Sequence, residues 1–273
     1  MSHFNIEAPL VCVAAVLSVG MANATPIAVA TYDFSGNSLA ASEIGAPSLT
    51  AIDPASANAF VTDSVFGTTK TVYQFDGTSV SGNQGGLALN TTGLLSSSAY
   101  SVDIVFSFDS NGPSWERILD ASNRSSDNGF YVEPGGKLQI YPVGNGPDFW
   151  TFGDYHRVTM TNDGAGHVSA YLDGNFQFDL ITTVMDFATY AANPNDLLTF
   201  FSDNTSGPAQ TEWVPGKVSL IRLYDIELNS GDVGDIGGGG GNNGSIPEPA
   251  SLALLSVGLG ALGFRNRKRK HSA

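Results

Sequence analysis

Apolar and polar residues alternate in short segments along most of this chain. Val158 and Met160, for example, alternate with Thr159 and Thr161. A period of two places successive side chains on opposite faces of a strand. Segments of this kind, rich in β-branched and aromatic residues and separated by Gly, Asn, Asp and Pro, predict strands with one buried face. The strands we expect are 29–34, 71–75, 86–89, 100–108, 117–120, 129–132, 137–141, 155–161, 167–172, 176–181, 197–201 and 217–228.

Tight turns connect several of these segments. The run 162–166, Asn-Asp-Gly-Ala-Gly, separates two of them, and Asp173-Gly174 opens the next hairpin. The chain has no internal repeat, and no long helical period precedes its C-terminal end. We therefore predict an all-β fold, an antiparallel two-sheet jelly-roll sandwich, in a single domain over residues 25–230.

An apolar segment at the N-terminus precedes this domain. Residues 8–21 are almost continuously apolar, and the small-residue triplet Ala22-Asn23-Ala24 follows. This arrangement is typical of a secretory signal peptide over residues 1–24, with cleavage after Ala24. The leading residues depart from the usual pattern because they contain no Lys or Arg. The segment predicts export.

A three-part tail ends the chain. A Gly/Asn-rich linker is expected over residues 231–245, followed by Pro247-Glu248-Pro249, an apolar stretch at 250–264 and a basic cluster at 265–270. Fifteen apolar residues are short for a stable span, which needs about 17–25. The basic cluster would keep its end in the cytoplasm. We expect a short hydrophobic helix that associates transiently with the inner membrane.

In the order of its parts, the segment 246–273 resembles the PEP-CTERM sorting signal of Gram-negative bacteria. The resemblance implies processing by an exosortase, an integral-membrane cysteine peptidase. It also implies a link to extracellular polysaccharide. The expected location is the cell surface or the extracellular matrix.

A second resemblance concerns the domain. Residues 72–77 (VYQFDG), 155–158 (YHRV), 168–174 (VSAYLDG) and 216–225 (GKVSLIRLYD) occur in an order and spacing similar to laminin G-like domains. The resemblance implies a concanavalin A-like jelly roll whose concave face often binds sugars.

Charge narrows the possible partners. The chain has 12 Lys+Arg and 26 Asp+Glu. Between residues 25 and 246 the balance is seven basic and 24 acidic residues, a net charge of 7 − 24 = −17. So acidic a domain repels nucleic acid, and we expect no nucleic-acid partner. The single cysteine, Cys12, lies in the signal peptide, so the mature chain has no disulfide or zinc–cysteine site.

Calcium is the cofactor that the loops favour. Asp203 and Asn204 follow the apolar strand 197–201, and Asp127 lies in another oxygen-rich turn. Calcium needs several oxygen donors, some of them charged, and loops supply these well. Laminin G-like domains often bind one calcium ion from such loops. The alternative is that these residues only form Asx turns.

Aromatic side chains provide candidate sugar contacts. Trp115, Trp150, Trp213 and Tyr131 are expected to form a stacking platform, with the ordinary alternative that they belong to the core.

Motifs for catalysis are absent from the sequence. It has no G-x-S-x-G or H-E-x-x-H motif, and no E-x-D-x-x-E run of the kind used by glucanases of this fold. Glu116 and Asp120 have an even spacing but are interpreted as an ordinary solvated pair. We therefore predict a non-enzymatic surface or matrix protein that binds polysaccharide. The alternatives are a glycan-active enzyme of the same fold and a structural matrix protein without a ligand.

Overall fold

The structure is a computed structural model that describes residues 25–78, 83–95, 98–109, 115–193, 195–205 and 212–237. The predicted cleavage site at Ala22 and Ala24 and the sorting motif at 247–249 lie outside the described residues. Within those ranges, no helix has both the length and the apolar character that a membrane span requires.

Strands dominate the described chain, with one short α-helix near its end. The strands are β1 (Ala30–Tyr32), β2 (Thr50–Ile52), β3 (Ala59–Val65), β4 (Thr68–Phe75), β5 (Gly86–Asn90), β6 (Tyr100–Phe108), β7 (Glu116–Asp120), β8 (Gly129–Val132), β9 (Lys137–Tyr141), β10 (Gly144–Phe149), β11 (His156–Asn162), β12 (His167–Leu172), β13 (Asn175–Ile181), β14 (Leu197–Phe200) and β15 (Gly216–Tyr224). The helices are η1 (Ser35–Asn37), η2 (Phe187–Thr189) and α1 (Ser230–Gly237).

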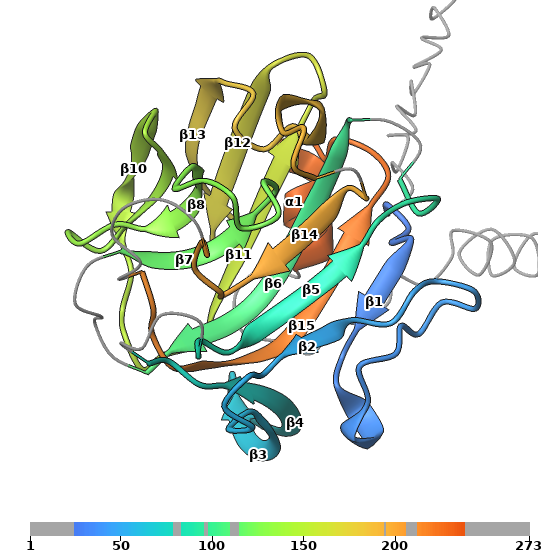
Figure 1. Ribbon diagram of the computed structural model, residues 1–273. Coiled ribbons are helices and arrows are strands. Elements are labelled where there is room, and N and C mark those ends of the chain that lie inside the picture. Colours follow the sequence, from blue (N-terminus) through green and yellow to red (C-terminus); the bar gives the residue numbers. More distant parts are fainter. Residues whose placement is uncertain are drawn as a thin grey trace, which may run out of the picture.

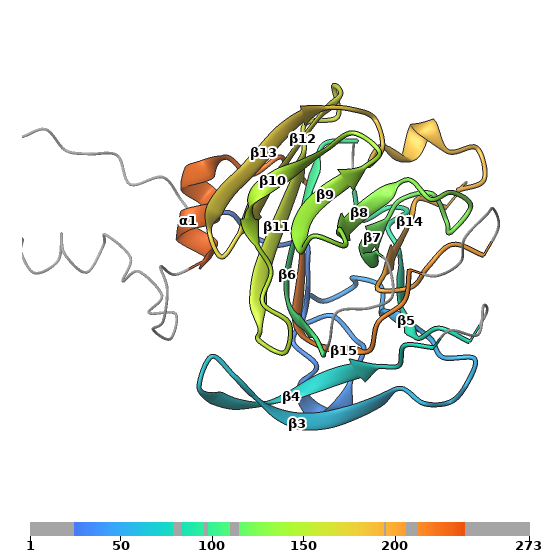
Figure 2. The ribbon, with the colours of Figure 1, turned by 90° about the vertical axis from the view of Figure 1, so that its left-hand side faces the viewer.

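Two antiparallel sheets pack face to face. In the part of the chain that is described, sheet A contains eight strands in the order β13-β12-β11-β6-β15-β4-β3, with β1 paired to β15. Sheet B contains seven, in the order β10-β9-β8-β7-β14-β5-β2. Figures 1 and 2 show the two layers of this jelly-roll sandwich. The predicted all-β fold is confirmed.

The sequence pattern predicted the buried strands well and missed the exposed ones. β6, β8, β9 and β12 have the predicted bounds, and the predicted hairpins β11–β12 and β12–β13 pair as expected. β2, β3 and β10 were not predicted. Most of their residues are exposed or only partly buried, so their sequences carry no alternation between a buried and a solvated face.

Aromatic rings fill the space between the sheets. Phe75 of β4 and Phe201, directly after β14, stack with centroids 4.2 Å apart. Phe106 of β6 stacks on Trp150 at 4.8 Å and contacts Phe108 edge-on at 5.0 Å. These rings come from both sheets, so they fix the sheet separation as well as burying apolar area.

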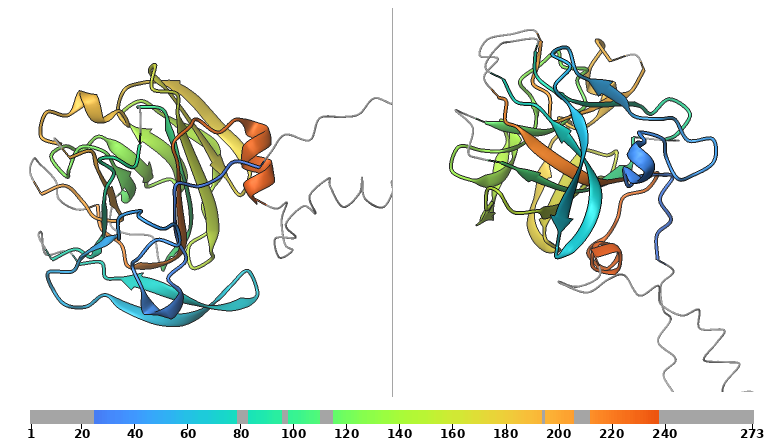
Figure 3. Two further views of the ribbon diagram at one scale, coloured as in Figure 1. Left: turned by 90° about the vertical axis from the view of Figure 1, so that its right-hand side faces the viewer. Right: turned by 90° about the horizontal axis from the view of Figure 1, so that it is seen from below.

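Helix α1 lies on the outer face of sheet A, on the side away from sheet B (Figure 3). Val233 and Ile236 pack against Tyr171 of β12, Tyr224 of β15 and Leu228. The first residues of the predicted linker, 231–237, are therefore part of the folded domain. Burial of two apolar side chains on one face of the helix accounts for this difference from the prediction.

One buried carboxylate connects the centre of sheet A with this helix. Asp103 of β6 is fully buried and faces outward from the sandwich. Arg157 Nε and Nη2 each donate to one of its oxygens at 2.7 Å. Arg222 Nε and Nη2 donate to Asp103 Oδ2 at 3.0 and 2.9 Å, and Nη2 also donates to the carbonyl oxygen of Ile236 at 3.0 Å. This Asp103 network therefore links β6, β11, β15 and α1.

We predict that Asp103→Asn lowers the free energy of unfolding by about 3–5 kcal/mol, because it leaves two partly buried guanidinium groups without their shared anion. Asp179→Asn removes a half-exposed carboxylate that lies 3.4 Å from His167, and should cost less than about 1 kcal/mol. Urea denaturation of the two variants measures both effects. A similar small loss in the two proteins would contradict the structural importance of the network.

Candidate functional site

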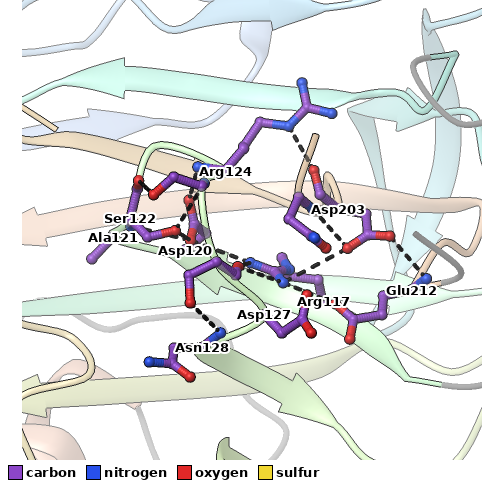
Figure 4. Close-up of polar contacts among 12 residues, drawn as sticks. Arg117, Asp120, Ala121, Ser122, Arg124, Asp127, Asn128, Asp203 and Glu212 are labelled. Atoms are coloured by element: carbon purple, nitrogen blue, oxygen red, sulfur yellow. Dashed lines mark hydrogen bonds and ion pairs between the residues drawn. The ribbon is translucent and has the colours of Figure 1, made fainter. Parts of the chain in front are cut away.

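One predicted metal ligand, Asp203, belongs to a buried cluster of charged side chains beside the inner strand β7 of sheet B, here called the Arg117 cluster (Figure 4). β7 supplies Arg117 and Asp120, the loop after β14 supplies Asp203, and Glu212 precedes β15. The side chains of Arg117, Asp120 and Asp203 have no solvent exposure, and that of Glu212 is 11% exposed. Three carboxylates are therefore held around one guanidinium group.

Arg117 contacts each carboxylate of the cluster. Its Nη2 lies 2.8 Å from Glu212 Oε2 and 3.7 Å from Asp203 Oδ1, and its Nη1 lies 3.2 Å from Asp120 Oδ1. Both terminal nitrogens donate to the carbonyl oxygen of Ser126 at 3.2 Å. A guanidinium group presents several donors in one plane, so a single Arg can hold partners from three separate segments.

Backbone and hydroxyl donors complete the shells of the two aspartates. Asp120 Oδ1 accepts from the amide and hydroxyl of Ser122, and its Oδ2 accepts from the amide of Arg124 at 2.7 Å. Asp203 Oδ1 accepts from the amide of Asn204 at 2.7 Å, and Oδ2 from the amide of Glu212 at 3.1 Å. These bonds order the two loops rather than leaving oxygens open to a ligand.

Glu212 has an unusual environment for a carboxylate. Burial raises its pKa to about 7, and the Asp203 carboxylate adds to this effect although Arg117 opposes it. The hydroxyl of Tyr131 lies 2.8 Å from Glu212 Oε2 and supplies a further partner. Glu212 therefore changes its charge near neutral pH.

The three predicted calcium ligands lie in or beside the Arg117 cluster. Asp203 and Asn204 are buried, and Asp127 is partly buried in the neighbouring turn. Among the residues described, no group of three or more acidic, His or Cys side chains is arranged to hold a metal. The positive charge near Asp203 comes from the guanidinium group of Arg117, whereas a calcium ion was expected there from the sequence. Calcium binding stays a prediction.

The four predicted aromatic residues do not share one surface. Trp150 is 5% exposed and lies in the core, where it stacks on Phe106 and contacts His156. Tyr131 is fully buried, with the Arg117 guanidinium carbon 4.8 Å from its ring centroid. The expectation of an exposed platform is therefore corrected for these two rings. Trp115 and Trp213 are partly buried, and Trp115 contacts Tyr131 edge-on.

The other candidate acid pair is also buried. Glu116 and Asp120 have no solvent exposure, so the interpretation as a solvated pair is wrong. β7 is an inner strand of sheet B, between β14 and β8, and a register irregularity follows Arg117. An even spacing therefore did not place these two side chains on a solvent face.

A large groove lies on the outer face of sheet A and was not predicted. Its volume is about 1150 Å³. The β3–β4 hairpin bounds one side, the segment before β11 and the β12–β13 turn bound another, and the last turn of α1 reaches its rim. Figure 2 shows the hairpin and the helix extending from the same face of the sheet. A groove of this kind, with convergent polar groups, is the usual form of a ligand site.

Polar pairs and one exposed ring line this groove. Lys217 Nζ lies 3.1 Å from Asp63 Oδ2, to which the hydroxyl of Tyr155 donates at 3.2 Å. His156 Nδ1 lies 2.7 Å from Asp173 Oδ2. Phe66, at the tip of the hairpin, is 61% exposed. The charged residues of the lining comprise three cations and three anions: Lys70, Arg157, Lys217, Asp63, Asp154 and Asp173.

Local interactions lower the pKa of two carboxylates of the groove, Asp63 and Asp173. Burial opposes ionisation of Asp63, but the amide of Ser64 and the ammonium of Lys217 lower its pKa. Burial likewise opposes ionisation of Asp173, and His156 together with the amide of Arg157 lowers its pKa. These two carboxylates are therefore charged hydrogen-bond acceptors at neutral pH.

The sequence contained a signal for the part of the groove that was missed. Val65-Phe66-Gly67-Thr68 has a glycine at the second position of a two-residue turn, between residues that form two paired strands. X-Gly between short segments is a hairpin signal. This signal was overlooked because β3, the first strand of the hairpin, is mostly exposed or partly buried and shows no clear alternation.

The C-terminal residues match a known sorting signal. Residues 245–270 match the family described as the PEP-CTERM protein-sorting motif. The chain carries a PEP-CTERM sorting motif. This motif indicates export to the cell envelope or surface of a Gram-negative bacterium. A search of curated proteins found no match to this sequence.

The solved structures similar to this chain include β-sandwich domains. Domain 4 of AbnA, a GH43 extracellular arabinanase from Geobacillus stearothermophilus in complex with arabinotriose, is 17% identical, with 77% of this chain and 98% of that chain covered and a TM-score of 0.55. A structure described as HCR/D-Sa-GBL1/C is 13% identical, with coverage of 77% and 51% and a TM-score of 0.53. The binding domain of botulinum neurotoxin serotype D/C is 11% identical, with coverage of 77% and 51% and a TM-score of 0.49. At these identities the likeness to the first two structures establishes the fold alone.

The titration of Glu212 predicts a pH-dependent stability. Its folded pKa of about 7 lies above the ordinary 4.5, so the native state binds more protons between these values. The contribution of Glu212 to the free energy of unfolding therefore falls as the pH rises through this window, by on the order of 3 kcal/mol.

We expect Glu212→Gln, which stays uncharged, to lack this decrease. Urea denaturation of both proteins at about pH 5 and about pH 8 measures the difference. Identical pH dependence in the wild type and the variant would contradict the assignment.

Proposed function

We propose that this protein is a non-enzymatic, surface-associated polysaccharide-binding protein whose sorting tail is processed by an exosortase. The observation that carries the binding proposal is the groove of about 1150 Å³ on the outer face of sheet A, lined by paired charges and aromatic side chains. The PEP-CTERM motif supports export and sorting. The β-sandwich architecture is compatible with this function without proving it.

The shape and chemistry of the groove suit a chain of sugars. It is open to solvent rather than a closed pocket, so a polymer can enter it from the surface. Carboxylate and ammonium groups supply hydrogen bonds to hydroxyls, and an exposed ring supplies a stacking face. Such a shallow site binds weakly, but many copies in one matrix gain avidity.

The burial of Glu116 and Asp120 supports a role without hydrolysis. Glycoside hydrolysis uses two carboxyl groups that flank the scissile bond, one of them acting as an acid. Asp120 accepts hydrogen bonds from Ser122, Arg124 and Arg117 and is removed from the groove by its place in sheet B. The glycan-active enzyme and the matrix protein without a ligand remain alternatives that the experiments below distinguish.

Exosortase processing predicts a defined mass for the mature protein. We expect removal of residues 1–24 and a cut near Pro247-Glu248-Pro249, because the short apolar stretch and basic cluster hold this segment only transiently in the membrane. Intact-mass measurement of the native protein from cells with and without the exosortase tests this. A mass from wild-type cells that still includes residues 265–270 would contradict processing.

Polysaccharide binding predicts retention without hydrolysis. The purified domain should bind exopolysaccharide from the producing organism, with no release of reducing ends. Lys217→Ala removes a hydrogen-bond donor in the groove and should weaken binding about three- to tenfold. Lys137→Ala, which removes a lysine outside the groove lining, should leave binding unchanged. Retention and reducing ends are followed in the same incubation.

Two results would contradict this proposal. Release of reducing ends would support the enzyme alternative. No retention of the wild-type domain would support the structural role without a ligand.

A further inference from the structure

The β3–β4 hairpin extends beyond the body of sheet A as an arm. β3 and β4 pair with each other from Ala59–Gln74 to Val65–Thr68. β4 pairs with β15 only through its last three residues, 73–75. The remaining length of the hairpin, here called the β3–β4 arm, therefore forms no ladder with β15, and it projects past the other strands (Figure 2).

One side of the arm is packed on the outer face of sheet A. Val65 and Val72 are buried against Val105 of β6, with Tyr155 and Leu220 packed beside them. The ion pair between Asp63 and Lys217 adds a polar contact. These contacts fix the arm beside the groove, while much of its other side stays exposed.

The tip of the arm has a residue that the turn disfavours. Phe66 and Gly67 have φ of 47° and 78°, so both central residues of this two-residue turn adopt positive φ. Such turns prefer Asn-Gly or Asp-Gly, and a bulky aromatic residue in the left-handed region is strained. The ring of Phe66 is also 61% exposed to water. Both features oppose stability, and strain of this kind concentrates where ligands are held.

We propose that Phe66 stacks on a sugar ring in the groove, and that the β3–β4 arm holds the polysaccharide chain against sheet A. This inference rests on the proposed function and assigns its main apolar contact. Phe66 lines the groove together with Lys70, Asp63 and Lys217, so an apolar face lies beside hydrogen-bonding groups. That combination matches a pyranose, which has an apolar C–H face and polar hydroxyl edges.

The charge of the domain selects an uncharged polysaccharide. The groove lining has equal numbers of Lys+Arg and Asp, and the domain over residues 25–246 has a net charge of −17. A uronate-rich chain would gain no net attraction in the groove and would be repelled by the rest of the surface. A neutral sugar chain is not repelled by the negative surface of the domain.

The test uses the full mature domain and exopolysaccharide of the producing organism, separated by anion exchange into neutral and acidic fractions. Phe66→Asn places the preferred residue in the turn and removes the ring. It should raise the melting temperature by about 2–4 °C and weaken binding of the neutral fraction about tenfold. Phe66→Tyr keeps a ring and should bind as the wild type does.

Phe149→Asn is the matched control, because Phe149 is 67% exposed and lies outside the groove lining. It should not change binding. If the wild type binds and Phe66→Asn binds equally well, the role of Phe66 is wrong while the proposed function stands. If the wild type binds only the acidic fraction, the ligand class is wrong. If the wild type binds neither fraction, the proposed function fails and this inference fails with it.

Discussion

The arrangement of the outer face of sheet A depends on one buried carboxylate, Asp103. It lies on the central strand β6, and its partners come from both neighbouring strands. Removing a carboxylate from water is unfavourable unless its oxygens are fully satisfied. Here two guanidinium groups and the hydroxyl of Thr159 supply five hydrogen bonds. Because such a cluster tolerates little displacement, it fixes three strands in register on the face opposite the core.

The same network divides the outer face of sheet A into two regions. On one side, Tyr171, Tyr224 and Leu228 form the apolar seat of α1. On the other, Val65, Val72 and Val105 form the apolar contact beneath the β3–β4 arm. Arg157, which binds Asp103, also lines the groove between them. Gly237, the last described residue of α1, also lines this groove.

Strands were predicted correctly from the sequence where β-branched and aromatic residues form a clear pattern and the strand is buried. β6 and β12 have their predicted bounds because β-branched and aromatic residues fill them between clear turns. The second half of β4 was predicted at 71–75, but β3 was missed because its residues are mostly exposed or partly buried and show no clear alternation. The Arg117 cluster was located only in part. Asp203 and Asp127 were predicted as oxygen donors. The contact between Asp203 and Arg117 was not predicted, because the two residues are far apart in the sequence and no local pattern indicates their pairing.

The contacts described above account for most of the few basic residues in this acidic domain. Of its seven basic residues, two lie at the Arg117 cluster and four on the outer face of sheet A: Arg117, Arg124, Lys70, Arg157, Lys217 and Arg222. Most of the domain's positive charge therefore balances carboxylates that the fold buries or places at the groove. The remaining surface keeps an excess of negative charge, which favours solubility and repels polyanions. The groove lining is locally neutral, with three cations and three anions, so its charge balance differs from that of the rest of the domain.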